Sequence, residues 1–275
     1  MRFFLQTLLV LLCTGTFVSA QFTPPPATDV AAGDSPYHFS WKRDLSYLTL
    51  GGLSAGTGVY LQERHDAPLL SDLRLNSYAT VNVFDRLGLV NGREGARKWS
   101  DRTLNASAAL PAVLFLSPRL RRKAPQVALL YTETMLITGG VTNLLKTSIV
   151  RPRPYVYGEE WNPNDPLSSG DRASFISGHT SLSAAGSFFF ARVFTDFHPD
   201  SKLKPVVWTV AATLPAVTGY LRVRAAKHFP TDVIAGYAFG ATVGYLVPTL
   251  HKKHILPRGM RINGGTSSVG LTYTW

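Results

Sequence analysis

The sequence has almost no cysteine and comparatively few charged residues. Its one cysteine, Cys13, lies in an apolar stretch near the start of the chain. A chain without further thiols forms no internal disulfide and no cysteine-based zinc or redox centre. Charged residues make up 16% of the chain and apolar residues 45%, whereas about 25% of an average soluble domain is charged. Low charge combined with apolar runs favours a membrane protein, or a helical protein with an extensive core.

Acidic residues are the scarcer of the two charge types. The chain has 28 basic and 17 acidic residues, and its formal net charge is +11. Such a surface suits anionic partners, among them phosphorylated substrates, lipid headgroups and nucleic acid. The sequence has no nucleic-acid-binding motif, and its basic residues gather at the ends of apolar segments, as the positive-inside rule describes. The composition therefore favours a membrane and an anionic partner other than nucleic acid, and it indicates no protein partner.

The order of composition changes predicts four segments. Residues 1–20 read as a secretory signal peptide, with Arg2 before the apolar run and Val18-Ser19-Ala20 as a cleavage site; the alternative is an uncleaved first membrane helix. Residues 21–44 are a proline-rich spacer, 45–250 a helical domain, and 251–275 a basic tail with β-like alternation.

Apolar segments of near membrane-spanning length dominate the helical domain. Five of them are residues 104–117, 127–145, 180–197, 206–221 and 233–250, and a glycine-rich stretch at 45–61 needs close packing to be helical. In the last segment Gly236, Gly240 and Gly244 share one helix face, which allows helices to approach closely. The sequence predicts an all-α bundle of about five or six helices, embedded in a membrane, with a short C-terminal strand or hairpin.

Basic clusters predict the orientation of this bundle. Residues 119–123, 202–204 and 251–258 carry basic residues and would share the cytoplasmic side. The polar motifs then lie on the outer face, provided that 45–61 does not cross. The remaining histidines, including His198 and His251, match no motif and are expected at the surface.

Three polar islands interrupt the apolar pattern. They are Lys146 with Arg153-Pro154, then Ser177-Gly178-His179, then Arg222 with His228 and Asp232. Cations can bind a phosphate dianion, one histidine can attack phosphorus, a second can transfer protons, and a carboxylate can orient the attacking ring. These residues therefore predict phosphoester chemistry.

The islands resemble the three-part signature of the type 2 phosphatidic acid phosphatase and vanadium haloperoxidase superfamily: K-x6-RP, PSGH and SR-x5-H-x3-D. Order and internal spacing agree, while Ile176 and Leu221 replace the proline of the second part and the serine of the third. The resemblance implies a metal-independent phosphatase without a cofactor, acting on phosphomonoesters or pyrophosphates of lipids. Candidate substrates are phosphatidic acid, phosphatidylglycerol phosphate, undecaprenyl pyrophosphate and lipid A phosphates. The site would face the periplasm or exterior from the inner membrane.

The resemblance and the chemistry assign three catalytic residues. His228 is the nucleophile that forms a phospho-histidine. Asp232, placed by Pro230 in the first turn of a helix, would accept a hydrogen bond from the His228 ring; alone, it could be a helix N-terminal acid. His179 is the general acid that protonates the leaving alkoxide and then activates water.

Phosphate binding is assigned to five further residues. Lys146, Arg153 and Arg222 form a cationic clamp. Ser177 is expected to cap a helix that begins near Gly178, whose free backbone N–H groups would face the phosphate. Arg151 and Arg224 are further cations that could contact a headgroup.

Three other functions remain open. The chain could be a soluble acid phosphatase of the same superfamily, periplasmic or secreted. It could be a haloperoxidase, which would require vanadate as its cofactor. It could also be a non-catalytic membrane module that binds phospholipid headgroups, although binding alone does not need His179, His228 and Asp232.

Overall fold

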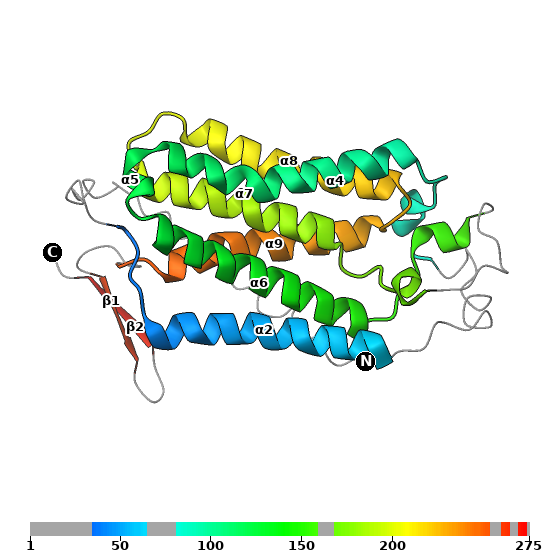
Figure 1. Cartoon of the computed structure of the whole chain (residues 1–275), viewed down its shortest axis with the longest axis horizontal. Coiled ribbons are helices and arrows are strands. Elements are labelled where there is room, and N and C mark those ends of the chain that lie inside the picture. The colour runs from blue at the N-terminus through cyan, green and yellow to red at the C-terminus, as the bar shows by residue number, and fades with distance from the viewer. Residues whose placement is uncertain (1–34, 65–80, 159–167, 254–259, 265–268, 274–275) are drawn as a thin grey trace.

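A computed structural model describes residues 35–64, 81–158, 168–253, 260–264 and 269–273. Six long helices lie side by side in a bundle (Figure 1). They are α2 (Trp41–Arg64), α4 (Glu94–Ala109), α6 (Ala124–Ser148), α7 (Gly178–Phe197), α8 (Lys204–Arg224) and α9 (Pro230–Leu250). The predicted helical bundle is confirmed. The expected signal peptide at 1–20 lies outside the described residues, and α2 begins before the expected boundary at residue 45.

Short elements connect the long helices. They are η3 (Asp85–Gly88), η4 (Leu110–Leu116), α5 (Pro118–Arg121), η5 (Pro154–Tyr157) and η6 (Ser169–Arg172). The helix expected at 104–117 is placed wrongly, because α4 ends at Ala109 and η4 follows. Pro111 lies at the start of η4, where it cannot donate an α-helical hydrogen bond. The polar residues from Glu94 onward, which precede the five predicted apolar segments, form most of α4.

Helix α7 lies at the centre of the bundle and contacts α4, α6, α8 and α9. The glycine face of α9 packs against it, as the spacing predicts. A methyl group on Gly236 would lie 2.6 Å from the Ser177 carbonyl oxygen, and one on Gly244 would lie 3.0 Å from the Ala185 Cα atom. These glycines therefore bring the start of α9 directly against the start of α7.

Helix α2 lies alongside α6 (Figure 1). A Cβ on Gly51 would lie 2.8 Å from the backbone of Leu136, so the glycines of α2 provide the close packing that a helix here needs. Helix α2 runs alongside the other long helices, and the expectation that 45–61 does not cross a membrane stays a prediction. Among the described helices, α8 and α9 are long and apolar enough to cross a membrane.

The segments that precede α2 and follow α9 meet at one end of the bundle. Tyr37 and Lys252 form an isolated β-bridge, and His38 N donates to the His251 carbonyl at 2.7 Å. His251 is 2% exposed, so its expected surface position is wrong. Beyond it, β1 (Met260–Gly264) pairs antiparallel with β2 (Val269–Tyr273), with Met260 opposite Tyr273. The predicted C-terminal hairpin is thus present.

Candidate active site

The predicted site residues gather at the bundle end opposite the Tyr37–Lys252 bridge. Lys146 lies in the last turn of α6 and Arg222 in the last turn of α8. His179 lies in the first turn of α7, and Asp232 in the first turn of α9. His228 lies in the connection between α8 and α9. Two helix ends and two helix starts, far apart in sequence, therefore lie at the same end of the bundle (Figure 1).

His228 is held by a backbone carbonyl. Its side chain is almost fully buried, and Nδ1 lies 2.8 Å from the Ser174 carbonyl oxygen. A carbonyl only accepts hydrogen bonds, so Nδ1 carries the proton and Nε2 carries the lone pair needed for attack. Burial lowers the pKa of His228 well below its usual value, and Lys146 and Arg153 lower it further. The ring is neutral, and hence nucleophilic, at neutral pH.

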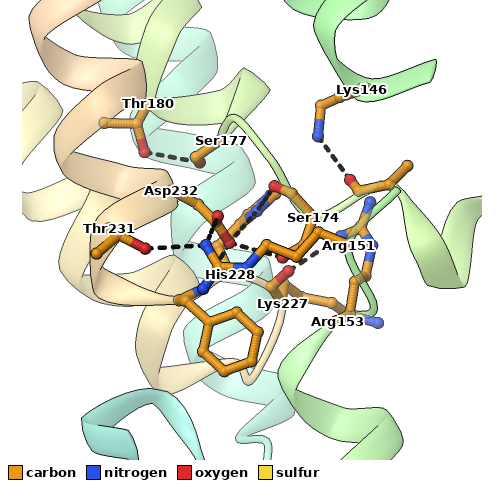
Figure 2. Close-up of polar contacts among 12 residues, drawn as sticks. Lys146, Arg151, Arg153, Ser174, Ser177, Thr180, Lys227, His228, Thr231 and Asp232 are labelled. Atoms are coloured by element: carbon orange, nitrogen blue, oxygen red, sulfur yellow. Dashed lines mark hydrogen bonds and ion pairs between the residues drawn. The ribbon is translucent and has the colours of Figure 1, made fainter. Parts of the chain in front are cut away.

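Asp232 does not bond the His228 ring directly, contrary to expectation. Its Oδ2 lies 3.8 Å from Nδ1, because Nδ1 is occupied by the Ser174 carbonyl. Instead Oδ2 accepts hydrogen bonds from Ser174 Oγ at 2.6 Å and from Phe229 N at 2.9 Å (Figure 2). Asp232 therefore caps the N-terminus of α9, which agrees with the alternative that it is a helix N-terminal acid. It also fixes Ser174, whose carbonyl orients His228.

Arg151 anchors Asp232 from the other side. Its guanidinium pairs with the Asp232 carboxylate and donates to Thr231 Oγ1 at 2.9 Å (Figure 2). It also donates to Asp85 Oδ2 at 2.6 Å. The same group lies 4.4 Å from the centre of the Phe229 ring. These partners give Arg151 a structural role, and the expectation that it contacts a headgroup stays a prediction.

His179 is paired with an acid that the sequence did not reveal. Its Nε2 lies 2.9 Å from Asp101 Oδ1, on α4. Burial lowers the pKa of His179 to about 4, with Arg222 adding to this effect and Asp101 opposing it. Asp101 lies in a polar stretch that precedes the five predicted apolar segments. No motif marks it, and only correct placement of α4 could have brought it to His179.

Arg222 is buried, and one of its guanidinium N–H groups has no hydrogen-bond acceptor among the described residues. Its Nη1 lies 3.3 Å from Ser100 Oγ and 3.8 Å from Asp101 Oδ1. Its Nε is buried and has no hydrogen-bond partner among the described residues. A buried guanidinium N–H without an acceptor is costly, so an anion at this position would supply what the protein lacks.

A pocket of about 370 Å³ opens beside Arg222 and His179. Its lining includes four basic side chains together with His179 and Asp101; the four are Arg97, Arg153, Arg222 and Lys227. Arg153 enters this pocket with Nε donating to the Gly170 carbonyl at 2.7 Å. Burial, more than any other cause, lowers the pKa values of both Arg153 and Lys227.

Lys146 lies beside a second pocket, of about 210 Å³, which shares Arg153 with the first. Its Nζ donates to the Ala173 carbonyl at 2.9 Å (Figure 2). Burial, with a further contribution from Arg153, lowers the pKa of Lys146 to about 7. The three cations, Lys146, Arg153 and Arg222, are close together. His228 lines neither pocket, so its buried ring is not open to a ligand in this state.

Ser177 and Gly178 begin α7 where expected, but not in the expected way. The Ser177 side chain makes no cap bond to the helix; its Oγ pairs with Thr180 Oγ1 at 2.9 Å (Figure 2). The Ser177 backbone N donates to the Asp232 carbonyl at 3.0 Å, which ties α7 to α9. A Cβ on Gly178 would lie 3.4 Å from Lys146 Cε, so this glycine makes room for the lysine stem.

Residues 127–256, which carry all the predicted site residues, match the family model described as the PAP2 superfamily. This part of the chain belongs to the PAP2 superfamily. The match extends from the start of α6 past the end of α9, so it includes Lys146, Arg153, His179, His228 and their neighbours, whereas α2 and α4 precede it.

Two curated relatives are each similar to part of the chain. The chain is 35% identical over 112 residues to a lipid A 1-phosphatase of Rhizobium johnstonii, which covers 39% of this chain and 41% of that protein. It is 27% identical over 143 residues to a lipid A 4'-phosphatase of Porphyromonas gingivalis, covering 50% of this chain and 57% of that protein. The chain spans about half the length of the curated relatives it matches.

A solved structure with similarity to the chain is a transmembrane PAP2-type phosphatidylglycerolphosphate phosphatase from Bacillus subtilis. The superposition covers 74% of this chain and 93% of that one, at 20% sequence identity and a TM-score of 0.36.

Proposed function

We propose that this protein is a metal-independent lipid phosphatase of the PAP2 superfamily that acts through a phospho-histidine on His228. The observation that carries the proposal is the buried Nε of Arg222, which has no acceptor among the described residues and lies beside a pocket that also contains Arg153 and His179. A phosphate oxygen is a suitable acceptor for a guanidinium N–H.

The first chemical step would be an attack by His228 Nε2 on phosphorus. The Nε2–P bond forms as the bond from phosphorus to the lipid oxygen breaks, and the leaving oxygen takes a proton from His179. Lys146, Arg153 and Arg222 would stabilise the equatorial oxygens as charge shifts in the transition state. The Ser174 carbonyl would hold the Nδ1 proton of the resulting phospho-histidine.

The second step would release phosphate and restore the enzyme. His179, now neutral, accepts a proton from water as the water oxygen bonds to phosphorus and the Nε2–P bond breaks. His179 must be protonated for the first step, yet burial lowers its pKa to about 4. We infer that a bound phosphate dianion raises this pKa, since a nearby negative charge favours the imidazolium.

Access to His228 would require a local rearrangement around Lys146. Its ammonium donates to the Ala173 carbonyl, and Ala173 and Ser174, whose carbonyl holds His228, are adjacent. A charged phosphate is a better acceptor for an ammonium than a neutral carbonyl. Transfer of Lys146 from the carbonyl to the phosphate would therefore open space next to the ring as the substrate binds.

The proposed substrate class is lipid A phosphates, because two relatives at detectable identity carry lipid A phosphatase names. The proposed location is the inner membrane, with the site facing the periplasm or exterior. Basic residues at the opposite end of the bundle support this orientation, since positive charges favour the cytoplasmic side; they include Lys42, Arg43, Arg121, Lys204 and Lys252.

The test is phosphate release by purified protein in detergent with EDTA, from lipid A, phosphatidic acid, phosphatidylglycerol phosphate and p-nitrophenyl phosphate. The variant is His228→Ala. Loss of the nucleophile should lower kcat by at least about a thousandfold. The matched control is His198→Ala, because His198 stacks on Phe194 away from the site and should not be needed for turnover.

Each outcome has a defined meaning. Release in EDTA that disappears only in His228→Ala supports the proposal, and the preferred substrate identifies the lipid class. Preference for soluble esters without detergent would identify a soluble acid phosphatase instead. Halide oxidation that depends on added vanadate would identify a haloperoxidase. Lipid binding without turnover by folded wild type would identify a headgroup-binding module.

A further inference from the structure

A second buried polar cluster lies at the bundle end far from the candidate active site. Asp44 is in the first turn of α2, Glu133 is in α6, and His251 follows the last residue of α9. Their exposed fractions are 2%, 0% and 2%. Because Asp232 and His251 lie at opposite ends of the α9 helix, the two sites are separated by about 30 Å, at a rise of about 1.5 Å per residue.

The three side chains point their ligand atoms at one another. His251 Nε2 lies 2.9 Å from Asp44 Oδ1 and 3.2 Å from Glu133 Oε2. His251 Nδ1 lies 2.7 Å from the Val247 carbonyl oxygen. Since that carbonyl only accepts, Nδ1 carries a proton and Nε2 is the atom directed at the two carboxylates.

A proton on Nε2 cannot satisfy both carboxylates. Asp44 already accepts hydrogen bonds from Ser40 N at 2.9 Å and Arg43 Nε at 3.1 Å, in addition to its contact with His251. Glu133 is fully buried, and apart from the 3.2 Å contact with His251 Nε2 neither of its oxygens has a hydrogen-bond partner among the described residues. A buried carboxylate without donors is unfavourable unless a cation neutralises it.

We propose that a first-row divalent cation, with zinc as its probe, binds between Asp44, Glu133 and His251. Two carboxylates and a neutral imidazole would balance the charge of the ion. Ligand atoms about 2.0–2.2 Å from zinc in a tetrahedral site are about 3.3–3.6 Å apart, so the observed separations need only a small expansion. A metal-binding imidazole commonly donates its other N–H to a carbonyl, as His251 does to Val247.

The cation would connect three helices at the end of the bundle far from the candidate active site. Asp44, Glu133 and His251 come from α2, α6 and the end of α9, so the ion would fix α2 to the rest of the bundle. The role is structural and independent of the proposed phosphatase reaction. The competing interpretation is a protonated His251 that pairs with the two acids and binds no metal.

The experiment measures zinc binding and melting temperature of the full chain in detergent. The protein is stripped with EDTA, dialysed, and titrated with ZnCl2 or, as a control, MgCl2. We expect one zinc per chain, and a rise in melting temperature of at least ~3 °C at saturating zinc but not with magnesium. Zinc that binds without raising the melting temperature, or none bound by wild type, overturns the proposal.

Two variants locate the ion. Glu133→Gln should lose both the bound zinc and the rise in melting temperature, while keeping the shape of the side chain. His179→Ala is the control, because His179 and Asp101 are another pair that could bind zinc, near the active site. This variant should keep both the bound zinc and the rise in melting temperature. Loss of the zinc effect in His179→Ala, or its retention in Glu133→Gln, overturns the proposal. If Glu133→Gln does not fold, His251→Asn replaces it, with the same expected result.

Discussion

The carboxylate of Asp232 reaches the ring of His228 through Ser174. Oδ2 accepts a hydrogen bond from Ser174 Oγ at 2.6 Å, and the Ser174 carbonyl holds Nδ1 at 2.8 Å. Within the described structure, one residue thus uses its side chain for the acid and its backbone for the histidine. The first prediction follows from this arrangement.

Ser174→Ala should lower kcat by about tenfold, the equivalent of one lost hydrogen bond of about 1.4 kcal/mol. The backbone carbonyl remains, so KM and the fold should change little. Steady-state kinetics on the preferred substrate and a melting curve test this. Ser201→Ala, in the α7–α8 connection, is the control. Unchanged kcat in Ser174→Ala would mean that Asp232 does not act through this residue.

Arg151→Met should destabilise the fold by about 3–5 kcal/mol, because it leaves buried carboxylates without their counter-charge. Asp85 and Asp232 both pair with Arg151, and their side chains are 3% and 0% exposed. The melting temperature in detergent measures the effect. Arg119→Met, on an exposed basic residue of α5, is the control, and equal melting temperatures for the two variants would contradict the prediction.

The pH dependence of kcat/KM should show a basic limb near pH 7, set by Lys146. The pKa of this lysine in the free enzyme is lowered to about 7, so its charge is present below that pH and is lost as pH rises through it. Because kcat/KM reports ionisations of the free enzyme, phosphate binding should weaken above this pH. Lys146→Arg keeps its charge and should move the limb to higher pH; a limb that stays in place would exclude Lys146 as its source.

His179→Gln should affect the two chemical steps differently. Without a general acid, turnover of alkyl phosphates should fall by about 100- to 10,000-fold. p-Nitrophenolate leaves without protonation, so the first step should survive and the second, which needs a base, should become limiting. Rapid quenching should then show a burst of p-nitrophenol and a phospho-enzyme. The absence of a burst, with equal losses on both substrates, would argue against this role.

Adjacent glycines in α2 offer a matched test of helix packing. A Cβ on Gly51 would lie 2.8 Å from the backbone of Leu136, whereas nothing lies within 4 Å of one on Gly52. Gly51→Ala should lower the melting temperature because α2 must move away from α6. Gly52→Ala should raise stability by up to about 1 kcal/mol through helix propensity. Equal effects of the two substitutions would show that α2 does not pack closely on α6.

The sequence predicted the helices best where apolar length and helix starts agree. The segments at 180–197 and 233–250 lie within α7 and α9, and Pro230 marks the start of α9 as expected. The segment at 104–117 failed because α4 is largely polar: its contacts with α7 and α8 are made partly through small residues such as Ser100 and Ser107, both buried. Hydropathy does not detect such a helix.

The site was predictable in its composition but not in its connections. Motif spacing selected His179, His228 and the three cations, which the fold brings to one end of the bundle. It could not reveal that Ser174 stands between Asp232 and His228, or that Asp101 pairs with His179. Both contacts join residues distant in sequence, and they depend on how helix ends are positioned. Arg151 was noticed as an extra charge, but its role depends on Asp85, which no sequence pattern connects to it.

The pairing of Tyr37 with Lys252 links the fate of a leader peptide, cleaved or retained, to the side of the membrane that the catalytic end faces. A bundle that spans a bilayer would hold these two residues on one side and His228 on the other. Removal of a leader after export would leave residue 37 outside, and His228 would then face the cytoplasm. An outward-facing catalytic end therefore requires that residue 37 stays inside. Labelling of single cysteines introduced at His38 and at Lys227, in intact cells, would show which of the two ends is accessible from outside.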